Sequence, residues 1–473
     1  MKDSYVNPLC ERYSSKEMQA LFSPDKKFSC WRKLWVALAE SEKELGVDIT
    51  DDEIAEMKAH VYDVDYEKAD EYEKNLRHDV MAHIKAYGDV CPKAKRIIHL
   101  GATSCFVGDN TDVIIYKEAL ELIENRLIAL LSIFYDFCLK HKNERTLSYT
   151  HFQAAQPTTV GKRATLWAQD LVFDLQRLRE VKDSLKLPGC KGTTGTAASF
   201  LKLLKTPDKV VKLEKLIAEK TGMKECYMVS GQTYSRKIDY FILSVLSGIA
   251  QSASKFANDI RLLSHLKEVD EPFEEKQVGS SAMAYKRNPM RSERICSLSR
   301  LVIADALNPA ITASCQWLER TLDDSANRRI SIPEAFLAVD GILTLYGNVL
   351  SGLKTYPKMM QKHLNEELPF MITENLMTYL TEKGGDRQVL HEAIRNLSVE
   401  TAKNMKENGA ENDLIEKIVA DDRFLVSAEE IEKIADSDEL IGIAVYQTET
   451  FCNEVLKPFT KCRKHDVDFE VKV

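Results

Sequence analysis

Residues 111–142 read TDVIIYKEALELIENRLIALLSIFYDFCLKHK and carry the clearest structural pattern of the chain. Their apolar side chains recur at helical spacing: Val113, Ile114, Leu120, Ile123, Leu127, Leu130, Leu131, Phe134 and Phe137. Roughly 30 residues rising about 1.5 Å each predict a helix about 45 Å long. Similar stripes recur at residues 160–185, 238–266, 291–306 and 333–353, and nothing between them alternates as a strand would.

Several such helices, with apolar faces wider than one coiled-coil seam, predict a central bundle that buries surface between subunits. Shorter helical patterns precede it, at 28–45 and 51–60, and follow it after about residue 356. We therefore expect an all-α protein of three helical domains: 1–110, 111–355 with the long helices, and 356–473. The tail from residue 461 is compatible with one short strand or none.

Composition limits the class of protein. The chain has 473 residues, 44% of them apolar, and 65 Lys+Arg against 73 Asp+Glu give a net charge of −8. It thus lacks the general basic field that attracts nucleic acid or an anionic membrane. Eleven cysteines without a CxxC pair favour reduced thiols over disulfides or a zinc site. With no signal pattern and no uninterrupted apolar run of about 20 residues, we expect a soluble, cytoplasmic protein without a metal.

A second stretch, residues 279–294 (GSSAMAYKRNPMRSER), is too polar for a core. By itself such a Gly/Ser/Asn/Pro loop is most often a solvated connection. The string nevertheless resembles the GSSxMPxKxN signature of the fumarase/aspartase superfamily, whose members release fumarate from succinyl-type substrates. Ala284 stands where that signature has proline, which removes a fixed φ but no functional group.

Further segments resemble the adenylosuccinate lyase family of that superfamily, over nearly the whole chain except about the last 60 residues. They are Arg77-His78-Asp79, Thr103-Ser104, Thr150-His151-Phe152-Gln153, KGTTGT at 191–196, SGQT at 230–233 and ERTLDDSANRR at 319–329. KGTTGT lacks the spacing of a P-loop, so no ATP or GTP binding is predicted. A turn near the site and a purely structural turn both remain open for it. Taken singly, His151 is as often structural as functional, whereas a residue such as His78 is more often structural and a lone arginine more often a surface or helix-end charge.

The chemistry implied by the resemblance explains the residue types. Removing a Cβ proton beside a carboxylate builds negative charge, so the site needs a base and cations or N–H donors. By resemblance Ser280 is the base, with its neighbour Ser281 left open. His151 is the acid that protonates the departing nitrogen, a task that suits an imidazole with a pKa near 6.5. Lys286 and Asn288 hold the substrate carboxylate.

A nucleotide substrate also needs a phosphate clamp, for which arginine offers bidentate geometry. The resemblance assigns this clamp to Arg12, Tyr13, Arg320, Ser325 and Arg329. It completes the substrate pocket with Arg77, His78, Asp79, Thr103, Ser104, Thr150, Gln232 and Arg294.

The reaction implied is elimination of fumarate from adenylosuccinate, giving AMP, and from succinyl-aminoimidazole-carboxamide ribotide (SAICAR), giving its carboxamide (AICAR), in purine biosynthesis. It needs no cofactor, and in the superfamily a homotetramer shares each site between subunits. Two alternatives stay open: another fumarate-releasing lyase, such as one acting on argininosuccinate, and a non-catalytic relative on the same scaffold. Retention of Ser280 and His151 argues against the second alternative.

Overall fold

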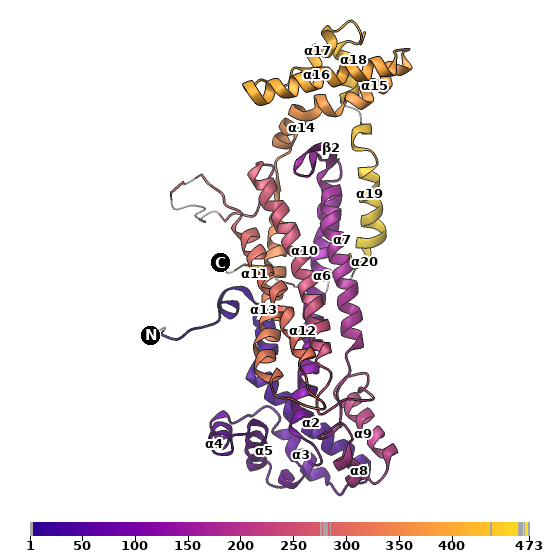
Figure 1. Ribbon diagram of the computed structural model, residues 1–473. Coiled ribbons are helices and arrows are strands. Elements are labelled where there is room, and N and C mark those ends of the chain that lie inside the picture. The colour runs from indigo at the N-terminus through magenta and orange to yellow at the C-terminus, as the bar shows by residue number, and fades with distance from the viewer. Residues whose placement is uncertain are drawn as a thin grey trace.

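The computed structural model describes residues 3–274, 277, 282–283, 285–435, 438–461, 467 and 469–471. Long helices run side by side and smaller groups of helices lie at both ends of the molecule (Figure 1). The bundle contains α6 (Ser104–Lys140), α7 (Val160–Ser184), α10 (Lys237–His265), α11 (Met290–Asp305) and α13 (Asp324–Gly352). Each of the five predicted stripes is therefore helical, which confirms the central bundle.

One end of the bundle carries the first helices of the chain (Figure 1). These are α2 (Pro24–Glu44), α3 (Asp51–Ala59), α4 (Tyr66–Leu76) and α5 (Asp79–Val90), and they are joined by α8 (Ala198–Leu204) and α9 (Pro207–Lys220). Before them, the π-helical turn η1 (Leu9–Tyr13) packs on α13, and α1 (Lys16–Leu21) packs on α6 and α13. The start of α2 shows why the sequence folds this way. Ser23 Oγ accepts a hydrogen bond from the Lys26 N–H at 3.2 Å, and Pro24 occupies the first helical position, where its missing N–H costs nothing.

The opposite end carries helices from the last third of the chain (Figure 1). They are α14 (Pro357–Met371), α15 (Thr373–Glu382), α16 (Arg387–Asn408), α17 (Leu414–Ala420) and α18 (Ala428–Ala435). The chain then returns along the bundle, where α19 (Ala444–Phe451) packs on α7 and α20 (Lys457–Thr460) packs on α6.

Two separate apolar cores hold these groups. A large core runs through the N-terminal helices and the bundle, and includes the fully buried Trp31, Trp35 and Phe256. A small core lies among α15 to α18, from Ile372 to Ile431. The N-terminal helices thus share their core with the bundle, whereas the C-terminal helices have one of their own. The three domain boundaries drawn from the sequence stay a prediction.

The largely helical fold that the sequence predicts is confirmed, and four short strands accompany the helices among the described residues. β1 (Arg145–Thr150) pairs antiparallel with β2 (Gln153–Thr159), and β3 (Val269–Asp270) pairs with β4 (Lys354–Thr355). The first pair escaped the sequence analysis because its residues are mostly polar and partly exposed, with no apolar residue at every second position.

Helix α13 begins nine residues before the predicted stripe and contains Pro333 in its interior. Its first turns escaped the pattern because their side chains are polar and line a cavity, as described below. In the described residues, two helical stretches are long and apolar enough to cross a membrane by length and composition alone, Met290–Ser314 and Asp324–Gly352. The second is 78% buried inside the bundle, as is typical of a core helix.

Candidate active site

A polar cavity of about 320 Å³ lies where the N-terminal helices meet the bundle. Five predicted substrate-binding residues line it: Asp79, Ser104, Arg320, Ser325 and Arg329. Asp79 and Ser104 are the first residues of α5 and α6, and Ser325 lies in the first turn of α13. Three helix N-termini therefore converge on the cavity, and their partial positive charge adds to that of the arginines. This arrangement suits an anionic ligand.

Two motifs that are separate in the sequence meet at the rim of this cavity. His78 caps α5, its Nδ1 accepting from the Met81 N–H at 3.3 Å, and its Nε2 lies 3.3 Å from Ser104 Oγ. Arg329 reaches the same place, with its guanidinium 3.7 Å from the Asp79 carboxylate. Arg77 ends α4 in the left-handed conformation, φ 53°, and is exposed, and Thr103 is the N-cap residue of α6.

A buried ion network forms the floor of the cavity. Arg236 donates to Asp324 at 2.6 Å and to both carboxylate oxygens of Asp109, at 3.0 and 3.2 Å. Arg320 donates to the other oxygen of Asp324 at 2.8 Å. Burial raises the pKa of Asp324 but Arg236 and Arg320 lower it, and the net pKa is below its ordinary value. Asp324 therefore holds Arg320 in place as a carboxylate.

The network continues to Arg328, which donates to Asp239 at 2.6 Å and to Asp112 at 2.9 Å, so that α6, α10 and α13 are tied together. Sequence reasoning missed these buried charges, and it missed Lys27, which also lines the cavity. Burial and the charge of Arg329 lower the pKa of Lys27. A faint signal was present in the spacing of Asp109 and Asp112, which lie three residues apart on one helix face.

Two glycine-containing motifs, KGTTGT and SGQT, pack together beside Arg320. Gly195 of KGTTGT has φ 86°, and a Cβ there would collide with the Ser230 carbonyl oxygen. A Cβ on Gly231 would lie 2.6 Å from the carbonyl oxygen of Glu319. The next residue, Gln232, donates its N–H to that same oxygen at 3.0 Å. The turn left open by the sequence thus lies next to the site, and only glycine permits these approaches.

Gln232 also touches a residue of the cavity wall. Its Oε1 accepts from the Cys105 thiol at 3.5 Å, and burial raises the pKa of that thiol to about 11. The thiol therefore stays protonated and can act as a donor at neutral pH.

The Thr150-His151 segment lies at the tip of the β1–β2 hairpin. His151 and Phe152 have φ 54° and 58°, which makes the connection a two-residue turn of the I′ type. β2 lies between His151 and α7, so His151 stands in a strand turn and not at a helix entrance. His151 is exposed. The hairpin follows the C-terminal end of α6, whereas Ser104 begins it, so the 37 residues of α6 put about 55 Å between them (Figure 1).

The segment around residues 279–294 is described in part. Ser280, Ser281 and Ala284 lie outside the described residues, so the predicted base is not placed. Lys286 and Asn288 come just before α11, and Arg294 is half-buried on it. The carboxylate of Glu271, on the other side of the segment, accepts from the N–H groups of Arg291 and Ser292 at 2.8 and 3.0 Å.

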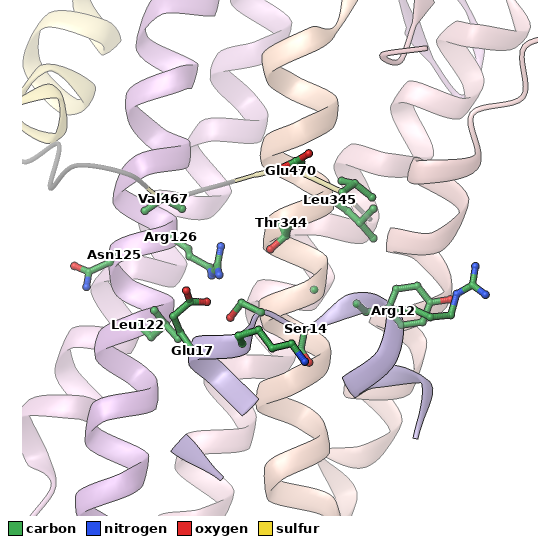
Figure 2. Close-up of a pocket in the computed structure, with 15 residues that line it drawn as sticks. Arg12, Ser14, Glu17, Leu122, Asn125, Arg126, Thr344, Leu345, Val467 and Glu470 are labelled. Atoms are coloured by element: carbon green, nitrogen blue, oxygen red, sulfur yellow. The ribbon is translucent and has the colours of Figure 1, made fainter. Parts of the chain in front are cut away.

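Arg12 and Tyr13 line a different cavity of about 290 Å³ (Figure 2). Tyr13 packs against Gly341 of α13, twelve residues beyond Arg329 and hence about 18 Å further along the helix. The guanidinium of Arg12 points away from Arg126 and Asn125 in that view. One chain therefore holds the predicted site residues in separate groups: the polar cavity, the hairpin tip, the start of α11 and η1.

Comparison with known proteins shows which sequences and folds are similar to this chain. Residues 15–304 match the family described as Lyase, and residues 369–451 match the family described as Adenylosuccinate lyase C-terminus. Proteins named adenylosuccinate lyase from Saccharomyces cerevisiae and Schizosaccharomyces pombe are 50% and 49% identical to the chain, over 97% and 96% of both partners in each comparison.

Solved structures share the fold. The 3-carboxy-cis,cis-muconate lactonizing enzyme of Pseudomonas putida superposes with a TM-score of 0.82 at 22% identity, covering 96% of this chain and 100% of that one. A fumarate lyase from Mesorhizobium gives 0.79 at 21% identity, covering 95% and 100%. The fold and the Lyase match define the chain as a lyase of the fumarase/aspartase superfamily. Within it, the chain belongs to the adenylosuccinate lyase family and is a carbon–nitrogen lyase.

Proposed function

We propose that the enzyme eliminates fumarate from adenylosuccinate, giving AMP, and from SAICAR, giving AICAR, in purine biosynthesis. The observation that carries the proposal is the polar cavity, where Arg320, Arg329 and Lys27 face three helix N-termini. Such a site matches a phosphorylated substrate, whereas malate, aspartate and argininosuccinate have no phosphate to place there. Near-full-length similarity to proteins named adenylosuccinate lyase supports the same substrate.

The elimination would divide its tasks among the remaining groups. Ser280 takes the Cβ proton, Lys286 and Asn288 stabilise the charge that builds on the neighbouring carboxylate, and His151 protonates the nitrogen that leaves. The C–N bond breaks as its electron pair passes to that nitrogen, and the Cβ–H pair forms the double bond of fumarate. These steps exchange only protons, so the proposal includes no cofactor.

We further propose that the enzyme works as a homotetramer in which subunits share each site. The separation of about 55 Å along α6 supports this, because no single chain can bring His151 to the polar cavity. Apolar side chains on the outside of α11 and of α12 (Leu307–Ser314) support it as well. Leu301, Leu307 and Ile311 are 45, 64 and 61% exposed, as expected of a surface covered by another subunit.

A cytoplasmic location and the absence of nucleic-acid or membrane partners belong to the same proposal. Its support is the net charge of −8 and the ten described cysteines, each of which is a free thiol.

The test is an ultraviolet absorbance assay on the purified enzyme with adenylosuccinate, SAICAR and argininosuccinate as separate substrates, with fumarate quantified in each. We expect fumarate from the first two and none from the third, without added cofactor. Fumarate from argininosuccinate alone would establish the rival lyase. No fumarate from any substrate, in a sample with intact quaternary structure, would establish the non-catalytic relative.

A further inference from the structure

The end of the chain crosses the middle of the bundle. We call residues 467–471 the C-terminal segment, of which Val467, Phe469, Glu470 and Val471 are described. Figure 2 shows Glu470 at α13 near Thr344 and Leu345, and Val467 on the side of Arg126 of α6. The Phe469 ring covers Gly347 so closely that a Cβ on this glycine would lie 2.5 Å from its Cγ and Cε1 atoms. The segment is therefore seated where α13 has no side chain.

Asn348, the next residue of α13, fastens the segment. Its Nδ2 donates to the Phe469 carbonyl oxygen at 3.0 Å, and its Oδ1 accepts from the Arg291 guanidinium at 2.7 Å. A carboxamide has one acceptor oxygen and one donor nitrogen, so each end of this side chain fits only the partner that it has. Asn348 thus joins the C-terminal segment to the start of α11.

Arg291 is held on several sides at the beginning of α11. Its side chain is 7% exposed, its guanidinium lies 3.1 Å from Glu274, and its backbone N–H donates to Glu271 at 2.8 Å. Lys286 and Asn288 precede Arg291 by five and three residues. The position of Arg291 therefore sets the point from which these two residues extend.

We propose that the C-terminal segment supports catalysis by fixing Arg291 through Asn348, which makes Asn348 a positioning residue for Lys286 and Asn288. The inference rests on the proposed role of those two residues at the substrate carboxylate. It gives a function to a part of the chain whose own sequence shows no motif.

The test uses a cycle of two substitutions, Gly347→Ala and Phe469→Ala, in the full-length enzyme. The alanine methyl expels the Phe469 ring but is otherwise compatible with a helix. We expect Gly347→Ala to raise KM for adenylosuccinate and lower kcat/KM about tenfold. In the Phe469→Ala background the methyl has room, so Gly347→Ala should change kcat/KM by less than twofold.

Asn348→Ala should match the loss caused by Gly347→Ala, and Asn396→Ala, an exposed asparagine of α16, is the matched control and should have no effect. A merely structural role would lower the melting temperature and the fraction of active enzyme, and hence kcat, without raising KM. A chain that ends at Lys461 lacks the C-terminal segment and should show the same rise in KM as Gly347→Ala.

An undiminished effect of Gly347→Ala in the Phe469→Ala background would overturn the proposal, as would wild-type kcat/KM in all three single variants. Lys286→Met separates the two levels of inference. Normal turnover in that variant would reject the carboxylate role of Lys286, while the coupling between Gly347 and Phe469 would still report on the link to α11.

Discussion

Glu42 is a carboxylic acid with no polar partner among the described residues. It is fully buried on α2, neither carboxylate oxygen has a hydrogen-bond partner, and burial raises its pKa to about 8. The folded chain therefore holds a proton that the unfolded chain releases near pH 4.5. This contribution to stability is complete below pH 4.5 and is lost as the pH rises to about 8.

Glu42→Gln should remove this pH dependence, because glutamine has the same shape and does not ionise. We expect the variant to gain stability over wild type by on the order of 3 kcal/mol as the pH rises from 5 to 8. Melting temperatures across that range measure the effect, and Glu44→Gln, exposed on the same helix, is the control. A constant difference between the two proteins at all pH values would show that Glu42 is ionised when folded.

Arg329 tests the phosphate assignment, since it lines the polar cavity and is 67% exposed, with only a long contact of 3.7 Å to Asp79. We expect Arg329→Ala to raise KM for adenylosuccinate about tenfold or more with a smaller effect on kcat, because a uniform binding contact is lost. Arg329→Lys should recover part of the loss. Initial-rate kinetics decide the matter, with Arg395→Ala on α16 as control. An unchanged KM would remove Arg329 from the clamp.

The β1–β2 hairpin fixes the backbone conformation of His151. His151 occupies a left-handed position, so a test of its chemistry must not also break the turn. Asparagine tolerates that conformation better than other non-glycine residues. His151→Asn should therefore keep the melting temperature and lower kcat about a hundredfold or more. Phe152→Asn, at the next position of the same turn, should keep kcat within a few-fold. Wild-type kcat in His151→Asn would mean that another group is the acid.

Elements differ in how far the sequence could predict them. The long helices follow from apolar spacing, because each buries one broad face in the bundle. The hairpin carried no comparable signal, since its turn is His-Phe and not the Asn-Gly or Asp-Gly pair that favours positive φ. The start of α13 was missed for a related reason: Ser325 and Arg329 face a cavity, so polar residues stand where the pattern requires apolar ones.

Resemblance to the family identified most of the site residues in the sequence but gave no distances between them. Arg77, Asp79, Ser104, Arg320 and Arg329 could be named from the sequence, whereas the ion network beneath them could not. Arg236 and Asp324 are charged residues of a kind that usually lies on the surface, and only the fold shows them buried and paired.

The whole molecule separates the hairpin from the polar cavity, which leads to a test by mixing subunits. His151→Asn changes the hairpin, which follows the C-terminal end of α6. Arg329→Ala changes the polar cavity, which lies at the N-terminal end of α6. We expect mixed oligomers, formed by dissociating and reassembling both variants together, to regain activity at substrate concentrations well below KM. Some of their sites would combine His151 of an Arg329→Ala chain with Arg329 of a His151→Asn chain. Activity of the reassembled mixture is compared with that of each variant treated alone.

The matched control mixes Arg329→Ala with Ser325→Ala, which affect one and the same cavity and should give no gain. Equal activity in both mixtures would contradict shared sites.

The two apolar cores also divide the chain in evolutionary terms. In the bundle and the N-terminal helices, buried ion pairs and close glycine contacts couple many residues. A substitution at one position there requires compensating changes at several others. The small core from Ile372 to Ile431 is separate from the large one, so we expect substitutions within it to be tolerated independently of those in the bundle. On either side of this core in the sequence, α14 packs on β1 and the turn at Asp438–Ile441 packs on β2. Selection should therefore be strictest in α14 and in the turn at Asp438–Ile441, because they support the two strands that flank His151.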